Sequence, residues 1–175
     1  MRKEKLLFVV LFSIVVIFNA CNSGSQNMDT QKEQIVYKAF DAFAQGNTDA
    51  MDSLCSTDYV EHQIDTAHSP LRGRAATNEA TKSYHKAMPD MKIVVNSIAV
   101  SNDTVLAYDI LSGTMTDTLM GIPPSNKQVS LTGADIFVVK NSKITEHWGF
   151  VDVNDMAQFA PPKEMPTDKT MKKKK

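Results

Sequence analysis

Apolar residues recur every three or four positions in the first half of the central region of the chain. Residues 34–44 show this spacing, which is typical of an amphipathic helix, and Gly46 is placed to end that helix. The segment Asn47–Leu54 can form a second short helix with its first residue as the cap. A third helix is expected over about Arg74–Ala87, because Pro89 stops it. The pattern therefore predicts three helices.

The period of the apolar positions changes to two from Met91 onward. Four segments rich in Val, Ile and Thr alternate in this way and predict β-strands: Met91–Val100, Thr104–Thr116, Lys127–Lys140 and Lys143–Val153. Two-residue hairpin turns are expected at Asn102-Asp103 and Asn141-Ser142, and the polar stretch Tyr59–Arg72 is expected to be a loop. Because helices precede a run of strands, we predict an α+β domain whose helices pack on one face of a curved antiparallel sheet.

The last predicted hairpin also predicts which side chains share a face. A turn at Asn141-Ser142 pairs Asp135 with Trp148 and Leu131 with Asp152. The shared face then carries the apolar residues Leu131, Phe137, Val139, Ile144, Trp148 and Phe150 together with the acids Asp135, Glu146 and Asp152. Carboxylates in an apolar concavity suit general acid–base chemistry; the alternative is that one or two of them lie at the rim of the sheet in water. His147 falls on the opposite face, where a surface or interface role is expected.

The N-terminus reads as an export signal. Three basic residues precede the apolar run Leu6–Phe18, and Ala20-Cys21 follows. A run of thirteen residues is too short to cross a bilayer as a helix, which needs about 20. We therefore expect a bacterial lipoprotein signal peptide over residues 1–20, with Cys21 lipidated and the protein anchored to a membrane of the cell envelope, at the outer membrane or the periplasmic face. The alternative is an ordinary secretory signal.

The remaining boundaries follow from composition. Residues 21–30 are expected to be a flexible tether, residues 31–160 one domain, and residues 161–175 a disordered tail rich in lysine. The net charge of −1 becomes more negative once the basic N-terminus is removed, which makes nucleic acid an unsuitable partner. With Cys21 lipidated, Cys55 has no partner for an internal disulfide and is expected to be a small buried apolar residue.

Short motifs in the domain resemble those of the SnoaL-like polyketide cyclase or ester cyclase family, which belongs to the NTF2-like superfamily. The matching segments are Tyr59–His62, Tyr84–Asp90, Ser112–Thr114 with Met120–Pro124, Gly133–Phe137 and Lys143–Trp148, followed by an acid at Asp152. They occur in the family's order, and the likeness as a whole covers the domain from Ile35 to Phe159. The resemblance implies an NTF2-like cone, in which three helices and a curved sheet enclose a pocket and two copies pair through their sheets.

The resemblance also implies chemistry. Enzymes of this family close a ring by intramolecular aldol chemistry without a metal or cofactor, and a pocket aspartate moves the protons. By motif position this aspartate corresponds to Asp152, and His62 and His85 correspond to polar positions at the pocket. Residues that would contact a small apolar organic ligand are Asp135, Glu146, Trp148, Met115 and Phe150. The histidines and acids of the loop after Tyr59 have no compact ligand spacing, so no metal site is expected.

Several positions depart from the family pattern and keep other functions open. Met115 stands where the family has a histidine, and Val138 where an arginine is common. These losses favour a non-catalytic lipoprotein that binds a small apolar ligand, whereas the acids and Trp148 favour an enzyme. A third alternative is a dimerisation or interaction module. Asp152 itself has a second interpretation, as the cap of a helix that begins near Val153.

Overall fold

The computed structural model describes residues 26–62 and 73–159. An N-terminal helix spans residues 26–44 and is followed by α2 (Thr48–Leu54), β1 (Cys55–Glu61) and α3 (Arg74–Ala87). Four long strands come next, and a 3₁₀-helix closes the described region: β2 (Lys92–Ser101), β3 (Thr104–Thr114), β4 (Gln128–Lys140), β5 (Lys143–Val151) and η1 (Asp155–Phe159). In this part of the chain no helix has the length and apolar character needed to span a membrane.

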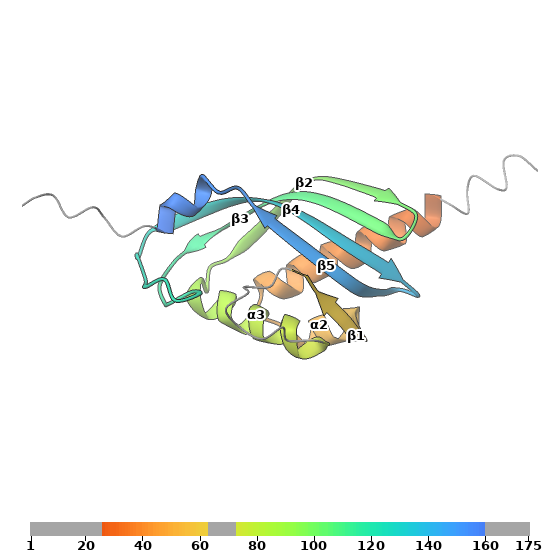
Figure 1. The fold of residues 1–175 in the computed structure, drawn as a ribbon, viewed down its shortest axis with the longest axis horizontal. Coiled ribbons are helices and arrows are strands. Elements are labelled where there is room, and N and C mark those ends of the chain that lie inside the picture. The colour runs from red at the N-terminus through yellow and green to blue at the C-terminus, as the bar shows by residue number, and fades with distance from the viewer. Residues whose placement is uncertain (1–25, 63–72, 160–175) are drawn as a thin grey trace, which may run out of the picture.

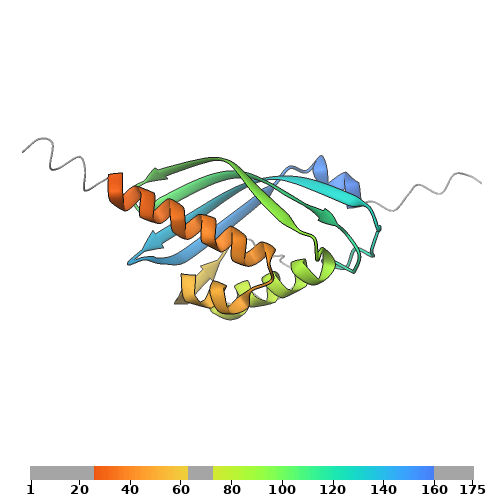
Figure 2. The ribbon, with the colours of Figure 1, turned by 180° about the vertical axis from the view of Figure 1, so that it is seen from behind.

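All five strands form one curved sheet in the order β1-β5-β4-β3-β2. Strands β2 to β5 form an antiparallel meander, and β1 adds to the edge at β5 in the parallel direction. The N-terminal helix, α2 and α3 all lie on the concave side of the sheet (Figures 1 and 2). This arrangement is the predicted α+β cone, with three helices packed on one face of a mixed, mostly antiparallel sheet.

Local sequence explains where the helices stop and start. Gly46 has φ +67°, a left-handed conformation that favours glycine and ends the N-terminal helix. A Cβ at this position would lie 2.6 Å from the ring of His85, so the close approach also requires glycine. Asn47 then caps α2 by accepting a hydrogen bond from the Ala50 amide at 3.0 Å. These contacts hold the N-terminal helix, α2 and α3 together.

Two apolar clusters fill the concave side. The first joins the N-terminal helix to the sheet and includes Val36, Phe40, Val105, Phe137, Val139 and Ile144. In it the rings of Phe40 and Phe137 meet edge to face, with centroids 5.5 Å apart. The second lies toward η1 and includes Met88, Met115, Val129, Leu131 and Phe159. Cys55 is buried in the first cluster, and burial raises the pKa of its thiol to about 11, so it is an apolar core residue as expected.

The predicted second and third helices, four long strands and two hairpin turns are confirmed, with strand ends that differ by at most two residues. Two expectations need correction. The N-terminal helix begins at residue 26, so residues 26–30 are helical and not part of a tether. Residues 55–61 form β1, although residues from Tyr59 onward were expected to be a loop. The predicted signal peptide, Cys21 and the lysine-rich tail lie outside the described residues.

The predicted pairing of the last hairpin is wrong beyond its first rungs. Val139 does pair with Ile144, but the next pair is Val138 with Glu146, so Thr145 is an extra residue on β5. This β-bulge shifts the register by one residue, and a shift of one turns every later side chain to the other face. Ile136 therefore lies opposite Trp148, and Asp135 lies opposite Gly149, which places Asp135 and Trp148 on opposite faces of the sheet.

Candidate functional site

Four adjacent strands contribute ionisable side chains to the concave face of the sheet. Glu61 on β1 lies opposite His147 on β5, and Phe137 on β4 also lies opposite this histidine, which puts Asp135 two residues away on the same face. Asp135 in turn lies opposite Ala107 on β3, next to Asp109. Because paired residues share a face, these groups form a row across the sheet. We refer to Tyr59, Glu61, Asp109, Asp135 and His147 as the acid–histidine cluster.

Hydrogen bonds run through the cluster from Tyr59 to Asp135. The Tyr59 hydroxyl donates to Glu61 Oε2 at 2.6 Å. The same carboxylate lies 2.9 and 3.1 Å from His147 Nδ1, and Nε2 on the other side of the ring lies 2.8 Å from Asp135 Oδ1. The side chains of Glu61, Asp135 and His147 retain only 15–19% exposure. The imidazole is therefore held between two carboxylates in a mostly dry environment.

The surroundings of His147 favour its protonated form. Burial acts to lower the pKa of the imidazole, but the hydrogen bonds and negative charges of Asp135 and Glu61 outweigh it and raise the pKa to about 9. Asp109 is also buried, with 4% exposure. Burial raises the pKa of this carboxyl well above its ordinary value, and the hydrogen bond and charge of Asp135 raise it further, against an opposing effect of His147. Asp109 and Asp135 are thus two neighbouring carboxyl groups, and the neutral form of Asp109 is favoured.

Glycine on the neighbouring strand makes room for Asp109. Gly133 lies directly opposite Asp109 in the sheet, and a Cβ there would be 2.9 Å from Asp109 Oδ1. This oxygen has no hydrogen-bond partner among the described residues. The space beside it belongs to the same concave side as the cluster.

Aromatic rings surround the cluster. Phe137 packs against the imidazole of His147, with ring centroids 4.6 Å apart. Tyr84 of α3 contacts Phe43 of the N-terminal helix at 5.3 Å between ring centroids. Burial raises the pKa of the Tyr84 hydroxyl, and the negative charges of Asp135 and Glu61 raise it further, so this hydroxyl keeps its proton. The cluster can therefore present a proton donor and a proton acceptor within an apolar surround.

The sequence-predicted acid Asp152 lies elsewhere. It is exposed at the end of β5, and its Oδ1 accepts hydrogen bonds from the amide and the side chain of Asn154 at 2.8 and 2.9 Å. The backbone oxygen of Asp152 accepts from Asp155, the first residue of η1. This is the capping arrangement that the sequence left open, and it does not bring Asp152 into the acid–histidine cluster. Asp135, by contrast, is at the centre of the cluster.

Several other predicted site residues lie on the convex face, because the bulge reverses the parity of β5. Glu146 and Trp148 are there, and Phe150 is 55% exposed. The ring of His62 stacks flat on Trp148 with centroids 3.9 Å apart, and its Nε2 lies 3.0 Å from Glu146 Oε2. The prediction that His147 is a surface or interface residue is wrong, since it occupies the concave position instead.

The last two predicted site residues have structural surroundings. His85 Nδ1 lies 3.1 Å from the backbone oxygen of Ala44, at the end of the N-terminal helix. Met115 is fully buried in the second apolar cluster, where it packs with Met88 and Leu119. Neither side chain belongs to the acid–histidine cluster.

Sequence reasoning missed Tyr59, Glu61 and Asp109. One local signal was available for Asp109, because it continues the buried alternation of Val105 and Ala107 along β3, where an acid is out of place. No local signal joins Glu61 to His147, since the two residues are 86 positions apart and meet only through the parallel pairing of β1 with β5.

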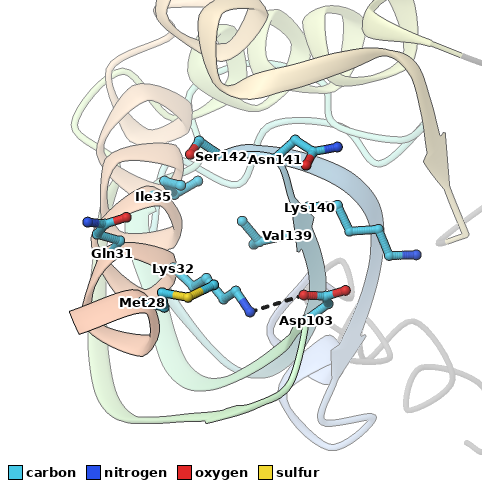
Figure 3. A pocket seen from close by; sticks show the side chains of 9 residues that line it. All are labelled: Met28, Gln31, Lys32, Ile35, Asp103, Val139, Lys140, Asn141 and Ser142. Atoms are coloured by element: carbon cyan, nitrogen blue, oxygen red, sulfur yellow. Dashed lines mark hydrogen bonds and ion pairs between the residues drawn. The ribbon is translucent and has the colours of Figure 1, made fainter. Parts of the chain in front are cut away.

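A separate open cleft of about 400 Å³ lies between the start of the N-terminal helix and the turns β2–β3 and β4–β5 (Figure 3). Its lining residues include Met28, Lys32, Asp103 and Val139, and an ion pair of 3.0 Å joins Lys32 to Asp103. No lining residue belongs to the acid–histidine cluster. Within residues 26–62 and 73–159, no three His, Cys, Asp or Glu side chains converge as metal ligands.

Comparison with known proteins gives one consistent result. The SnoaL-like polyketide cyclase family matches residues 34–158, which is most of the chain. The chain belongs to this family. Its fold is similar to that of a candidate SnoaL-like polyketide cyclase from Jannaschia sp. CCS1, with a TM-score of 0.67 and 20% identity over 77% of this chain and 95% of the other.

Two further solved structures show how widely the fold is used. One is IdmH from Streptomyces antibioticus, a candidate polyketide cyclase, with a TM-score of 0.63 and 24% identity over 74% of this chain and 97% of the other. The second is an LEH-like epoxide hydrolase from M. tuberculosis, with a TM-score of 0.60 and 17% identity over 75% and 90% of the two chains. No curated protein sequence matches the chain with significance. At these identities the structural likeness shows the fold.

The space that Gly133 leaves for Asp109 gives a test of the cluster geometry. We expect Gly133→Ala to destabilise the fold by about 1–3 kcal/mol, because the new methyl group collides with a buried carboxyl. In an Asp109→Ala background the same substitution should instead be neutral or stabilise by about 0.5–1 kcal/mol, since glycine is unfavourable within a strand. Urea unfolding of the four proteins measures the difference. Equal costs in both backgrounds would show that Asp109 does not occupy the space beside Gly133.

Proposed function

We propose that this protein is a cofactor-independent acid–base enzyme of the cyclase or isomerase type that acts on a small organic molecule. The observation that supports the proposal most directly is the buried carboxyl pair Asp109 and Asp135 with His147 beside it. A carboxyl group that is neutral near pH 7 can donate a proton, and an ionised carboxylate next to it can accept one. Membership of the SnoaL-like family adds a reaction class in which such proton transfers are required.

The proposed reaction is an intramolecular aldol ring closure. A carboxylate takes a proton from a carbon next to a carbonyl group, and the resulting carbanion attacks a second carbonyl carbon of the same molecule. The new carbon–carbon bond leaves an alkoxide, which receives a proton from the neutral carboxyl group. The proton removed and the proton returned balance, so the step needs no oxidant or reductant. The aromatic surround formed by Phe137 and Tyr84 suits an apolar substrate skeleton.

Charge restricts the substrate class. The proposed base, Asp135, is itself a carboxylate, and the neutral Asp109 beside it adds no positive charge. A substrate that carries its own carboxylate near the reacting carbon would be repelled in this low-dielectric interior. We therefore expect a neutral carbonyl compound, such as an ester or a ketone, as the substrate.

Proton abstraction can be measured before the natural substrate is known. We expect the protein to accelerate deuterium incorporation at the activated methylene of neutral β-keto esters in D₂O, followed by ¹H NMR. Asp135→Asn and Asp109→Asn should each reduce this rate by about 100-fold or more, the usual contribution of a positioned acid or base. Asp58→Asn, an exposed carboxylate on β1, is the matched control and should leave the rate unchanged.

Asp152→Asn separates the two catalytic assignments. A loss of exchange in this variant, with activity kept in Asp109→Asn and Asp135→Asn, would favour the sequence-based assignment over the cluster. Absence of exchange by the wild-type protein with every neutral β-keto ester would contradict the proposed enzyme. The second candidate, a non-catalytic protein that binds a small apolar ligand, would then be preferred. It is supported by Met115, which fills the core where the family has a histidine.

We further propose that the protein is a lipoprotein of the bacterial cell envelope. The support is the basic head, the short apolar run and the Ala20-Cys21 junction of the sequence. Cys21→Ala should move the protein from the membrane fraction to the soluble envelope fraction, detected by immunoblotting after fractionation. Cys55→Ala is the matched control, because this cysteine is buried in the core and should not affect membrane attachment. Unchanged membrane attachment of Cys21→Ala would contradict the proposal.

The convex face of the sheet supports a homodimer. Two cross-strand rows expose apolar side chains there, and the residues are Leu106, Ile136 and Trp148 in one row and Tyr108 and Phe150 in the other. Leu106, Tyr108 and Phe150 are each about half exposed, which is unusual for neighbouring large apolar residues on one face. All three main helices lie on the opposite side of the sheet (Figure 2).

Charge on this face should prevent association. We expect the wild-type protein to sediment as a dimer in analytical ultracentrifugation and Leu106→Lys to sediment as a monomer, because a buried unpaired lysine is strongly unfavourable in an interface. Val153→Lys, which is exposed after the end of β5, provides the control and should remain dimeric. A monomeric wild-type protein at micromolar concentration would contradict this arrangement.

A further inference from the structure

We infer that His147 is a positioning residue: an imidazolium held between Glu61 and Asp135, which keeps Asp135 ionised and leaves the shared proton on Asp109. This assigns separate roles within the cluster, with Asp109 as the proton donor, Asp135 as the acceptor and His147 as neither. The roles of Asp109 as proton donor and Asp135 as proton acceptor rest on the proposed function. The protonation states themselves rest on geometry and can be measured without turnover.

Both ring nitrogens of His147 lie within hydrogen-bond distance of carboxylate oxygens. Nδ1 lies 2.9 Å from Glu61 Oε2, and Nε2 lies 2.8 Å from Asp135 Oδ1. Carboxylate oxygens accept hydrogen bonds, so each nitrogen must carry a proton to satisfy both contacts. A neutral imidazole has only one N–H and would direct the lone pair of the other nitrogen at an oxygen. The arrangement therefore requires an imidazolium, or else a proton on one of the two carboxyl groups.

Glu61 contacts Nδ1, on the side of the imidazole ring opposite Asp135. The Tyr59 hydroxyl donates to Glu61 Oε2 at 2.6 Å, so this carboxyl group accepts from the hydroxyl as well as from the imidazole. Burial raises the pKa of Tyr59, and the charge and hydrogen bond of Glu61 raise it further, so the hydroxyl keeps the proton that it donates. Two donors directed at one carboxyl group stabilise its ionised form, which places the proton on the ring.

Asp109 and Asp135 differ in the groups that can stabilise a negative charge on them. The two carboxyl groups are diagonal neighbours on β3 and β4, and the hydrogen bonding and charge of Asp135 raise the pKa of Asp109. Such a pair holds one proton because two adjacent negative charges repel. Asp135 Oδ1 has a cationic N–H at 2.8 Å, whereas Asp109 Oδ1 has no partner among the described residues and is buried. The negative charge is therefore favoured on Asp135 and the proton on Asp109.

The charged and titratable groups that face His147 come from several elements. Among the described residues they are Tyr59 and Glu61 on β1, Asp135 on β4, Asp109 on β3 and Tyr84 on α3. Both nitrogens of His147 are occupied by these groups, so the ring has no lone pair with which to accept a substrate proton. Its effect on the reaction passes through Asp135.

Folding stability should decrease as the pH rises through the range in which the cluster titrates. The pKa of His147 rises from 6.5 to about 9 on folding, so its contribution to stability is complete below pH 6.5 and is lost as the pH rises through 9. The pKa of Asp109 is also raised on folding, and its neutral form is likewise lost as the pH rises. The free energy of unfolding should therefore fall between pH 6.5 and 9, and His147→Gln should flatten this fall.

NMR of the intact protein tests the protonation states directly. With ¹⁵N-labelled histidine, both ring nitrogens of His147 should show the shifts of protonated nitrogen at pH 7.5. With ¹³C-labelled aspartate, the carboxyl carbon of Asp109 should show the neutral form at pH 6, where exposed Asp90 is ionised. Asp90 is a suitable internal reference because hydrogen bonds from Thr114 lower the pKa of its carboxyl group.

Two variants separate positioning from packing. His147→Gln keeps a hydrogen-bonding side chain but removes the charge, so the Asp109–Asp135 pair should release its proton at a pH at least about one unit higher, a tenfold change in proton affinity. Glu61→Gln should lower the pKa of His147, with Asp58→Asn on the same strand as the control. If either variant fails to fold, the wild-type spectra decide alone.

A neutral His147 at pH 7.5, or a carboxyl titration that is unchanged in folded His147→Gln, would overturn the inference. These results are independent of catalysis. Protonation states as expected, together with no deuterium exchange, would support the inference and contradict the proposed enzyme.

Discussion

Burial of charge in an apolar cone is the constraint on which the rest of this structure depends. His147 lies in the middle of the concave face, with Glu61 at 2.9 Å and Asp135 at 2.8 Å. Its ring packs against that of Phe137, which belongs to the first apolar cluster. Moving ions from water into such surroundings costs several kcal/mol per ion, which close pairing only partly returns. Well-packed apolar residues of similar size would stabilise this fold at least as well. The cluster is therefore better explained by chemistry than by stability.

The arrangement of strands is what makes the pairing possible. The members of the cluster come from four neighbouring strands, and Tyr59 and Glu61 lie two residues apart on β1. The backbone hydrogen bonds of β1, β5, β4 and β3 fix the spacing between these side chains. Small residues complete the arrangement, because Ala107 and Gly133 leave volume for the carboxyl groups on neighbouring strands. A site built on strands in this way needs little rearrangement to hold a donor and an acceptor a few ångströms apart.

Much of this fold could be predicted from local sequence. Asn47, Gly46 and the turn Asn141-Ser142 act through their own backbone geometry, so the helix ends and the turn of the last hairpin could be predicted correctly. The candidate site could not be predicted to the same extent, because one residue decides it. Thr145 is an extra residue in β5, and its hydroxyl donates to the backbone oxygen of Val138 at 3.2 Å. Both β4 and β5 carry apolar residues on each of their faces, so the alternation of apolar residues does not reveal a bulge between them.

The bulge also explains why neighbouring residues have opposite surroundings. His147 and Trp148 are adjacent, yet the histidine faces the cone and the tryptophan faces outward with Phe150. Without Thr145 the indole would enter the cone, while the imidazole would lie on the outer face and Glu61 and Asp135 would lose the cation between them. The same single residue therefore sets both the polar interior and the apolar exterior of the sheet. Changes to the length of β5 should consequently alter both faces of the sheet together, whereas substitutions at Glu61 or Asp109 act on the interior alone.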